Sequence, residues 1–201
     1  MRKLIVRAFN ISLDGVSASY GTEYFEWCMS GIDPRVSGVA NHLPPDESQL
    51  DPTGELYGRA DALIMGRISY QRMVENFAPG GRQTDHPWAD MFNSARKVVF
   101  SRRLKTADWT NTTIAAGDTA EEIDKLRRGG DGHIVVYGGL SLWQSLMRLD
   151  LIDYFYLDVL PYVAGEGRRL FDNAGKYGPL DLVSSKVSSN GTLELEYRRH
   201  R

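Results

Sequence analysis

The stretch of sequence that decides the fold is Ile134–Leu142, IVVYGGLSL. It opens with apolar and aromatic residues that do not alternate with polar ones, as in a strand buried on both faces of a parallel sheet. Two glycines follow, and a predicted helix begins directly after them. Such a turn leaves backbone N–H groups open to a pyrophosphate or a nicotinamide ring. The ordinary G-x-G-x-x-G dinucleotide fingerprint is absent.

Two other apolar runs end in similar turns. Ala62–Met65 is followed by Gly66-Arg67, which suits a phosphate at the start of the next helix. Lys97–Phe100 is followed by Ser101-Arg102, whose hydroxyl and guanidinium groups suit the 2′-phosphate that separates NADPH from NADH. Each turn taken alone is also compatible with an ordinary surface turn or a basic loop, which is the plainer interpretation of Ser101-Arg102. Three of them at neighbouring strand ends favour a dinucleotide site.

Apolar runs and helix signals alternate along the chain. Helices are expected over 22–29, 68–77, 119–128 and 140–149; the last two open with the capping signatures Thr119–Glu122 and Ser141–Gln144. Asn190-Gly191 predicts a type I′ hairpin at the C-terminus. The proline-rich stretch 31–54 has no regular pattern, and loops as long as this one are often functional loops or insertions. These signals predict an α/β fold with a mostly parallel sheet and right-handed crossovers. Strands are expected over 3–9, 62–65, 97–100, 112–115, 133–137, 154–160, 180–188 and 192–198.

Composition narrows the class of protein. The 201 residues, 25% of them charged, predict one globular domain over 1–201, and the net charge of −2 gives no general attraction to nucleic acid or an acidic membrane surface. The single cysteine, Cys28, excludes an internal disulfide framework, and the four histidines lack metal-ligand spacing, so no metal is expected. No apolar run reaches the ~18 residues of a membrane helix, and the N-terminal run is too short for a secretory signal. We expect a cytoplasmic protein that binds a small-molecule substrate, with no nucleic-acid or membrane partner.

The order of these motifs resembles the dihydrofolate reductase superfamily. Within it, the best resemblance is to the group that is similar to the C-terminal reductase domain of bacterial riboflavin biosynthesis, the RibD C-terminal-like group. The resemblance covers nearly the whole chain. Each motif is weak alone, and five in the right order are fairly specific. The matching segments are Ser12–Gly15 (SLDG), Asp61–Tyr70, Phe100–Arg103, Val135–Leu142, and a last pattern of Leu151-Ile152-Asp153, Pro161, Gly165, Gly167 and Leu170-Phe171.

The resemblance implies a three-layer sandwich around an eight-stranded, mostly parallel sheet with a C-terminal antiparallel hairpin. It also implies NADPH as hydride donor. The residues it implies for the cofactor are Gly66, Arg67 and Ser69 at the adenosine-side phosphates, Ser101 and Arg102 at the 2′-phosphate, Gly138, Gly139, Ser141 and Leu142 at the pyrophosphate and nicotinamide, and Ala8, Asp14 and Gly15 beside the nicotinamide.

Two acidic residues are the candidates for catalysis, Asp14 and Asp51. Asp14-Gly15 is either a simple turn or a loop that closes over the cofactor. Asp51 is the best match by distance to the carboxylate that dihydrofolate reductases carry on their first helix, although a solvated charge is its plainer interpretation. The Pro-Trp of the dihydrofolate reductase loop is missing after Gly15, and Pro87-Trp88 is interpreted as a packing feature. The general acid is either a side chain or water.

The function expected is an NADPH-dependent reductase that delivers hydride to a small heterocyclic or carbonyl-like substrate. The alternatives are a true dihydrofolate reductase, a reductase of a ribosylaminopyrimidine, and a non-catalytic NADP-binding module. The deaminase zinc signature of riboflavin synthesis is absent, so the chain could perform only the reductive half. A homodimer is expected from the resemblance and from the apolar area of the aromatic run Tyr154–Tyr156.

Overall fold

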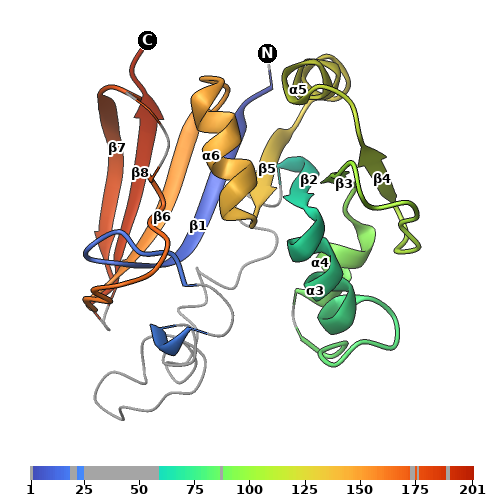
Figure 1. Ribbon diagram of the computed structural model, residues 1–201, viewed down its shortest axis with the longest axis horizontal. Helices are drawn as coiled ribbons and strands as arrows, with labels where there is room; N and C mark the ends of the chain where they lie inside the picture. Colours follow the sequence, from blue (N-terminus) through green and yellow to red (C-terminus); the bar gives the residue numbers. More distant parts are fainter. Residues whose placement is uncertain are drawn as a thin grey trace.

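The computed structural model describes residues 2–18, 22–24, 59–86, 88–172, 175, 177–188 and 191–201. Its eight strands form one sheet in the order β4-β3-β2-β5-β1-β6-β8-β7 (Figure 1). All pairings from β4 to β6 are parallel, and β8 pairs antiparallel with both β6 and β7. The strands are β1 (Leu4–Ser12), β2 (Ala60–Gly66), β3 (Lys97–Phe100), β4 (Thr112–Ala115), β5 (His133–Tyr137), β6 (Tyr154–Leu160), β7 (Leu180–Val187) and β8 (Leu193–Arg199).

Helices on both faces make three layers, with α6 seen in front of the sheet in Figure 1. The helices described over their full length are α3 (Arg67–Phe77), α4 (Ala89–Ser94), α5 (Thr119–Arg128) and α6 (Leu140–Arg148). Side chains of successive strand residues point to opposite faces, so β5 sends Val136 into the core under α5 and α6 and Val135 into the core under α3 and α4. The α/β fold, the mostly parallel sheet and the antiparallel C-terminal pair are therefore confirmed.

Residues 22–29 are described only at 22–24, so the predicted first helix falls mostly outside the described part, as do the stretch 31–54, Asp51, Cys28 and Asn190. At the predicted hairpin, Gly191 has φ +83, and the N–H of Ser188 donates to the carbonyl of Thr192 (2.9 Å). Trp88 is buried and packs against Phe92, with ring centroids 5.8 Å apart, which fits the packing role expected of it.

The predicted capping box of α5 is wrong by one residue. Asp118, not Thr119, precedes the helix, and its carboxylate accepts hydrogen bonds from the N–H groups of Ala120 (2.9 Å) and Glu121 (3.2 Å). Thr119 is the first helical residue. An aspartate at this position also places negative charge at the positive end of the helix dipole, so it is preferred to the following threonine. The signature Ser141–Gln144 is not a cap either, because Gly139 precedes α6 and Gln144 donates to the carbonyl of Arg169 (3.1 Å).

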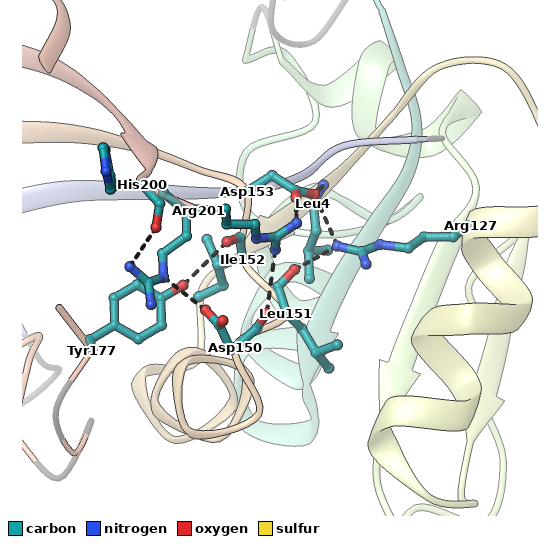
Figure 2. A network of polar contacts seen from close by, with 10 residues as sticks. Leu4, Arg127, Asp150, Leu151, Ile152, Asp153, Tyr177, His200 and Arg201 are labelled. Carbon is teal, nitrogen blue, oxygen red and sulfur yellow. Dashed lines mark hydrogen bonds and ion pairs between the residues drawn. The ribbon is translucent and has the colours of Figure 1, made fainter. Parts of the chain in front are cut away.

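The amino ends of β1 and β6 are joined by a buried carboxylate (Figure 2). Asp153 accepts a hydrogen bond from the N–H of Leu4 (2.8 Å) and pairs with Arg127 (2.9 Å) and Arg201 (3.1 Å). The Asp153 and Arg127 side chains are 8% and 7% exposed. The network therefore links the start of the central strand, the end of α5 and the C-terminus of the chain.

The structure bears on the expected homodimer and on the search for a membrane-spanning helix. The aromatic run Tyr154–Tyr156 lies in the interior strand β6, and Phe155 is fully buried in the core, so this run does not offer an exposed apolar face. The homodimer stays a prediction, now without that support. No helix in the described chain is long and apolar enough to cross a membrane.

Candidate functional site

One cavity of about 860 Å³ lies where the carboxyl ends of β2, β3, β4 and β5 meet. This is where open α/β sheets bind ligands, and the volume is typical of a ligand pocket. Of the residues implied for the cofactor, the cavity wall contains Gly66, Arg67, Ser69, Ser101, Arg102, Gly138, Gly139, Ser141 and Leu142. The three strand-end turns singled out in the sequence are thus brought to one site.

The turn between β5 and α6 requires its two glycines. Gly138 and Gly139 have φ +79 and +96, a region that L side chains rarely adopt. A Cβ on Gly139 would lie 3.3 Å from the backbone N of Gly66, so the β5 turn packs directly on the β2 turn. Close approach of the two turns puts both helix starts on the same cavity.

Gly66 differs because nothing inside the protein requires a glycine there. Its φ of −81 and ψ of 163 are open to most residues, and an added Cβ would meet no heavy atom within 4 Å. A side chain would instead take up space in the cavity that Gly66 lines. The residue therefore fits a backbone that a ligand approaches closely.

The starts of α3 and α6 are open in a way that the start of α5 is not. Neither Gly66 nor Gly139 supplies a side-chain cap, and neither helix has an acidic residue in its first turn. By contrast, Asp118 caps α5. Uncapped N–H groups at the positive end of a helix dipole favour an anion.

The turn after β3 is built around Ser101. Its Oγ accepts hydrogen bonds from the N–H groups of Arg103 (3.1 Å) and Leu104 (2.9 Å), which leaves its own hydrogen free to donate into the cavity. Arg102 is exposed and lines the cavity. A hydroxyl and a guanidinium from neighbouring residues therefore line the same cavity.

Charge is distributed unevenly in the cavity wall. Its described residues include five arginines and no Asp or Glu, although the whole chain is slightly acidic. A site of this composition attracts anions. The arginines are Arg7, Arg67, Arg72, Arg102 and Arg168.

Sequence reasoning missed several of these residues. Arg72 could have been found, because it lies three residues after Ser69 on the predicted helix and so shares its face. Asn10 has φ +56 beside a break in the β1–β6 register, and bulges of this kind redirect side chains next to active sites. Arg168 lies in the segment after β6, where no periodic signal pointed to the cavity.

Arg7 is held by a buried partner. Its two terminal nitrogens donate to the two carboxylate oxygens of Asp158, each at 2.7 Å, across β1 and β6. Burial raises the pKa of the Asp158 carboxyl, while the Arg7 guanidinium opposes that rise. Arg7 therefore lines the cavity with its charge paired to Asp158, which is not itself among the cavity-lining residues.

Three residues implied for the cofactor are not among the cavity-lining residues. Ala8 is fully buried in the core under α6, and Gly15 (φ +82) and Asp14 belong to the turn after β1. Asp14 Oδ1 accepts from Ser12 Oγ (2.7 Å) and the N–H of Ala164 (3.0 Å), and Oδ2 accepts from the N–H of Gly165 (3.0 Å). These hydrogen bonds, that from Ser12 first, lower the pKa of Asp14 to about 2. Asp14 is therefore ionised and engaged at neutral pH, which does not suit a proton donor.

The fold and the site define an α/β domain of the dihydrofolate reductase type with an anion-favouring cavity at the carboxyl edge of its sheet. The family model of the RibD C-terminal domain matches residues 2–193. The chain belongs to that family.

Individual relatives agree with this family. "Uncharacterized protein YyaP" of Bacillus subtilis (strain 168) is 30% identical over 197 residues, which cover 98% of this chain and 95% of that protein. A putative riboflavin biosynthesis protein from Shewanella sp. PV-4 has a similar structure, with TM-score 0.71, 21% identity and 99% of both chains covered. So has a dihydrofolate reductase from Enterococcus faecalis complexed with NADP(H) and RAB-propyl, with TM-score 0.60, 15% identity, and 99% of this chain and 97% of that one covered.

A third solved structure extends the comparison. A pyrimidine reductase-like protein from Corynebacterium diphtheriae has TM-score 0.59 and 14% identity, with 100% of this chain and 92% of that chain covered. At this level of identity the three solved structures show a shared fold.

Proposed function

We propose that this protein is an NADPH-dependent oxidoreductase that transfers hydride to a small heterocyclic substrate of the pterin or ribosylaminopyrimidine type. The observation that carries the proposal is the cavity, whose described wall joins four strand ends with five arginines and no acidic side chain. A phosphorylated dinucleotide has the charge and the extended shape that such a row of turns can bind. Membership of a family with reductase-like relatives supports the same assignment.

The chain's own residues have separate parts in this proposal. Gly66 and the start of α3 bind phosphate oxygens through backbone N–H groups, and Ser101 with Arg102 binds the 2′-phosphate. The turn at Gly138-Gly139 supports the pyrophosphate and the nicotinamide. NADPH, when bound, supplies the hydride from its nicotinamide ring, and the protein orients that ring and excludes water.

The proton that accompanies the hydride has few sources. Among the described cavity-lining residues there is no Asp, Glu, His, Lys or Cys. The proton therefore comes from water, from the Tyr137 hydroxyl, or from the part of the chain outside the described residues, where Asp51 lies. Asp51 stays a prediction.

The test of the cofactor assignment compares two neighbouring arginines. Arg102→Ala should raise the Kd for NADPH about tenfold or more and leave the Kd for NADH nearly unchanged, because a charge-assisted contact to phosphate contributes about 1.5–3 kcal/mol. Arg103→Ala is the matched control, since Arg103 is exposed on the same turn and is not among the cavity-lining residues. Equal losses for both cofactors in Arg102→Ala would remove the 2′-phosphate assignment.

The reaction is tested by following NADPH oxidation with a panel of pterins, pyrimidines, quinones and aldehydes. Turnover with a pterin or a pyrimidine supports a heterocycle reductase and distinguishes the two classes. Tight NADPH binding without turnover on any of them favours the alternative, a binding module without catalysis.

A further inference from the structure

The loops that follow β1 and β6 are bound to each other beside the cavity. We name them loop 12–17 and loop 161–172. Asp14 accepts the N–H groups of Ala164 and Gly165 through its carboxylate, each at 3.0 Å, and its backbone carbonyl accepts from Arg169 Nε (3.1 Å). Backbone N–H groups add three links, from Leu13 to the carbonyl of Tyr162 (2.8 Å), from Ser17 to that of Arg168 (2.9 Å) and from Leu170 to that of Gly15 (2.9 Å).

Little space separates the two loops. Gly167 has φ +122, and a Cβ there would lie 2.7 Å from Cγ1 of Val16, which is buried. Glycine is needed at this position for both reasons. Loop 161–172 therefore packs directly against loop 12–17. Among the described residues of loop 12–17, only Asp14 has a charged side chain.

The fastened loop delivers one charged side chain to the cavity. Arg168 lines the same cavity as Gly139, and its Nη2 donates to Ser141 Oγ (3.3 Å) on the first turn of α6. On the next residue, the Arg169 carbonyl accepts from Gln144 Nε2 (3.1 Å), so the loop is also attached to α6. Arg168 thus contacts the first turn of α6, which directly follows the turn where the proposed function places the pyrophosphate.

We propose that Arg168 binds the phosphate groups of the dinucleotide in this cavity, and that Asp14 is the positioning residue that holds Arg168 there by fastening loop 161–172 to loop 12–17. This inference rests on the proposed function. It gives Asp14 a part in ligand binding without contact to the ligand or to the reacting atoms.

The test is a double-mutant cycle on NADPH affinity with Arg168→Met, Asp14→Asn and the double variant. We expect Arg168→Met to raise the Kd about tenfold and to reduce the dependence of Kd on salt concentration, because one cationic contact is lost. Asp14→Asn should do the same to a smaller extent. The double variant should bind no more weakly than Arg168→Met, because Asp14 acts through Arg168. Arg168→Lys should recover part of the affinity.

Controls separate this inference from stability and from the proposed function. Arg148→Met removes an exposed arginine of α6 that is not among the cavity-lining residues and should change neither Kd nor its salt dependence. Additive losses in the double variant would make Asp14 merely structural. Unchanged binding in Arg168→Met, together with weakened binding in Arg102→Ala, would overturn this inference and leave the proposed function standing; no NADPH binding by the unaltered protein would overturn both.

A second measurement needs no variant. Hydrogen exchange of the Ala164 and Gly165 amides, whose partner is the Asp14 carboxylate, should slow when NADPH is added to the unaltered protein, because a bound Arg168 reduces opening of its loop. Exchange at both amides that is unaffected by saturating NADPH would overturn the inference. Because the measurement uses the unaltered protein, this outcome can be read even if Asp14→Asn does not fold.

Discussion

The two glycines Gly139 and Gly66 line the same cavity for different structural reasons. Gly139 is required by its φ of +96 and by the 3.3 Å approach of its Cβ position to Gly66. Gly66 has an ordinary backbone conformation and open space beside it. Gly139 is therefore required by the fold, whereas the fold places no such requirement on Gly66.

Gly66→Ala is therefore expected to separate stability from binding. Its free energy of unfolding should change by less than about 1 kcal/mol, because the poorer N-cap and the stiffer unfolded chain act in opposite directions. NADPH affinity should fall at least tenfold, because the methyl group occupies ligand space. Gly139→Ala is the contrasting variant and should lose both stability and binding. Chemical unfolding and a cofactor titration on the same samples measure the two effects, and unimpaired binding in Gly66→Ala contradicts this view of the site.

Asp14 gives a prediction about pH. Its pKa in the folded protein is about 2, below its usual 3.8, so the contribution of its hydrogen bonds to stability is fully present above about pH 4 and is lost as pH falls towards 2. The unaltered protein should exceed Asp14→Asn in urea midpoint at pH 7, and this difference should shrink between pH 4 and pH 2. If the difference in urea midpoint between the two proteins stays constant from pH 4 to pH 2, the negative charge of Asp14 does not account for its contribution to stability.

At the scale of elements, α4 is a helix that the sequence analysis did not predict, and a contact from β3 explains why. The helix has only six residues, and its last carbonyls are satisfied by Lys97 of β3, whose Nζ donates to the carbonyls of Phe92 (2.6 Å) and Ala95 (2.8 Å). Lys97 is fully buried, its Nζ lies 4.4 Å from the centre of the Trp109 ring, and burial lowers its pKa to about 8. A helix that is capped by a residue of another element leaves little local signal in its own sequence.

The cap of α5 can be tested in the same terms. Asp118→Ala should lower the free energy of unfolding by about 1 kcal/mol, because two backbone N–H groups lose their acceptor. Thr119→Ala, the substitution that a Thr119–Glu122 capping box would make costly, should change stability by only a few tenths of a kcal/mol. Chemical unfolding of the two variants decides between these positions, and a larger loss in Thr119→Ala would restore the capping box.

At the scale of the whole molecule, the two edges of the parallel sheet differ in what they do. The carboxyl edge carries the cavity, whose described wall contains the glycine turns and five arginines. The amino edge carries paired charges, among them Asp153 with Arg127 and Arg201, and Asp61 with Arg2 (2.6 Å). Stabilising contacts at one edge leave the other edge free for binding.

Asp153→Asn should accordingly destabilise the protein without changing its affinity. Leaving Arg127 buried and unpaired costs about 3–5 kcal/mol, which a urea unfolding curve would show as a lower midpoint. The folded variant should bind NADPH with unaltered Kd. Asp181→Asn, which removes a carboxylate that pairs with Arg198 and His200 at the surface, is the control and should leave the urea midpoint nearly unchanged. A large loss of NADPH affinity in folded Asp153→Asn would mean that the two edges are coupled.

The sequence by itself determined the elements whose signals are local. The runs that became β3, β4, β5 and β6 kept their predicted bounds. In β3 and β5 a short apolar run between polar turns needs no distant partner to be recognised. It also identified the glycine and arginine turns at Gly66, Ser101 and Gly138, since parallel strands bring their carboxyl ends together.

Only the tertiary structure decided which distant residues join those turns. Arg168 lines the cavity from loop 161–172, and the Asp14 carboxylate of loop 12–17 accepts hydrogen bonds from two backbone N–H groups of that loop. Contacts across some 150 positions of the chain leave no pattern in a single sequence. They arise when the sheet folds, and they set both the charge of the cavity and the ionisation of the groups around it.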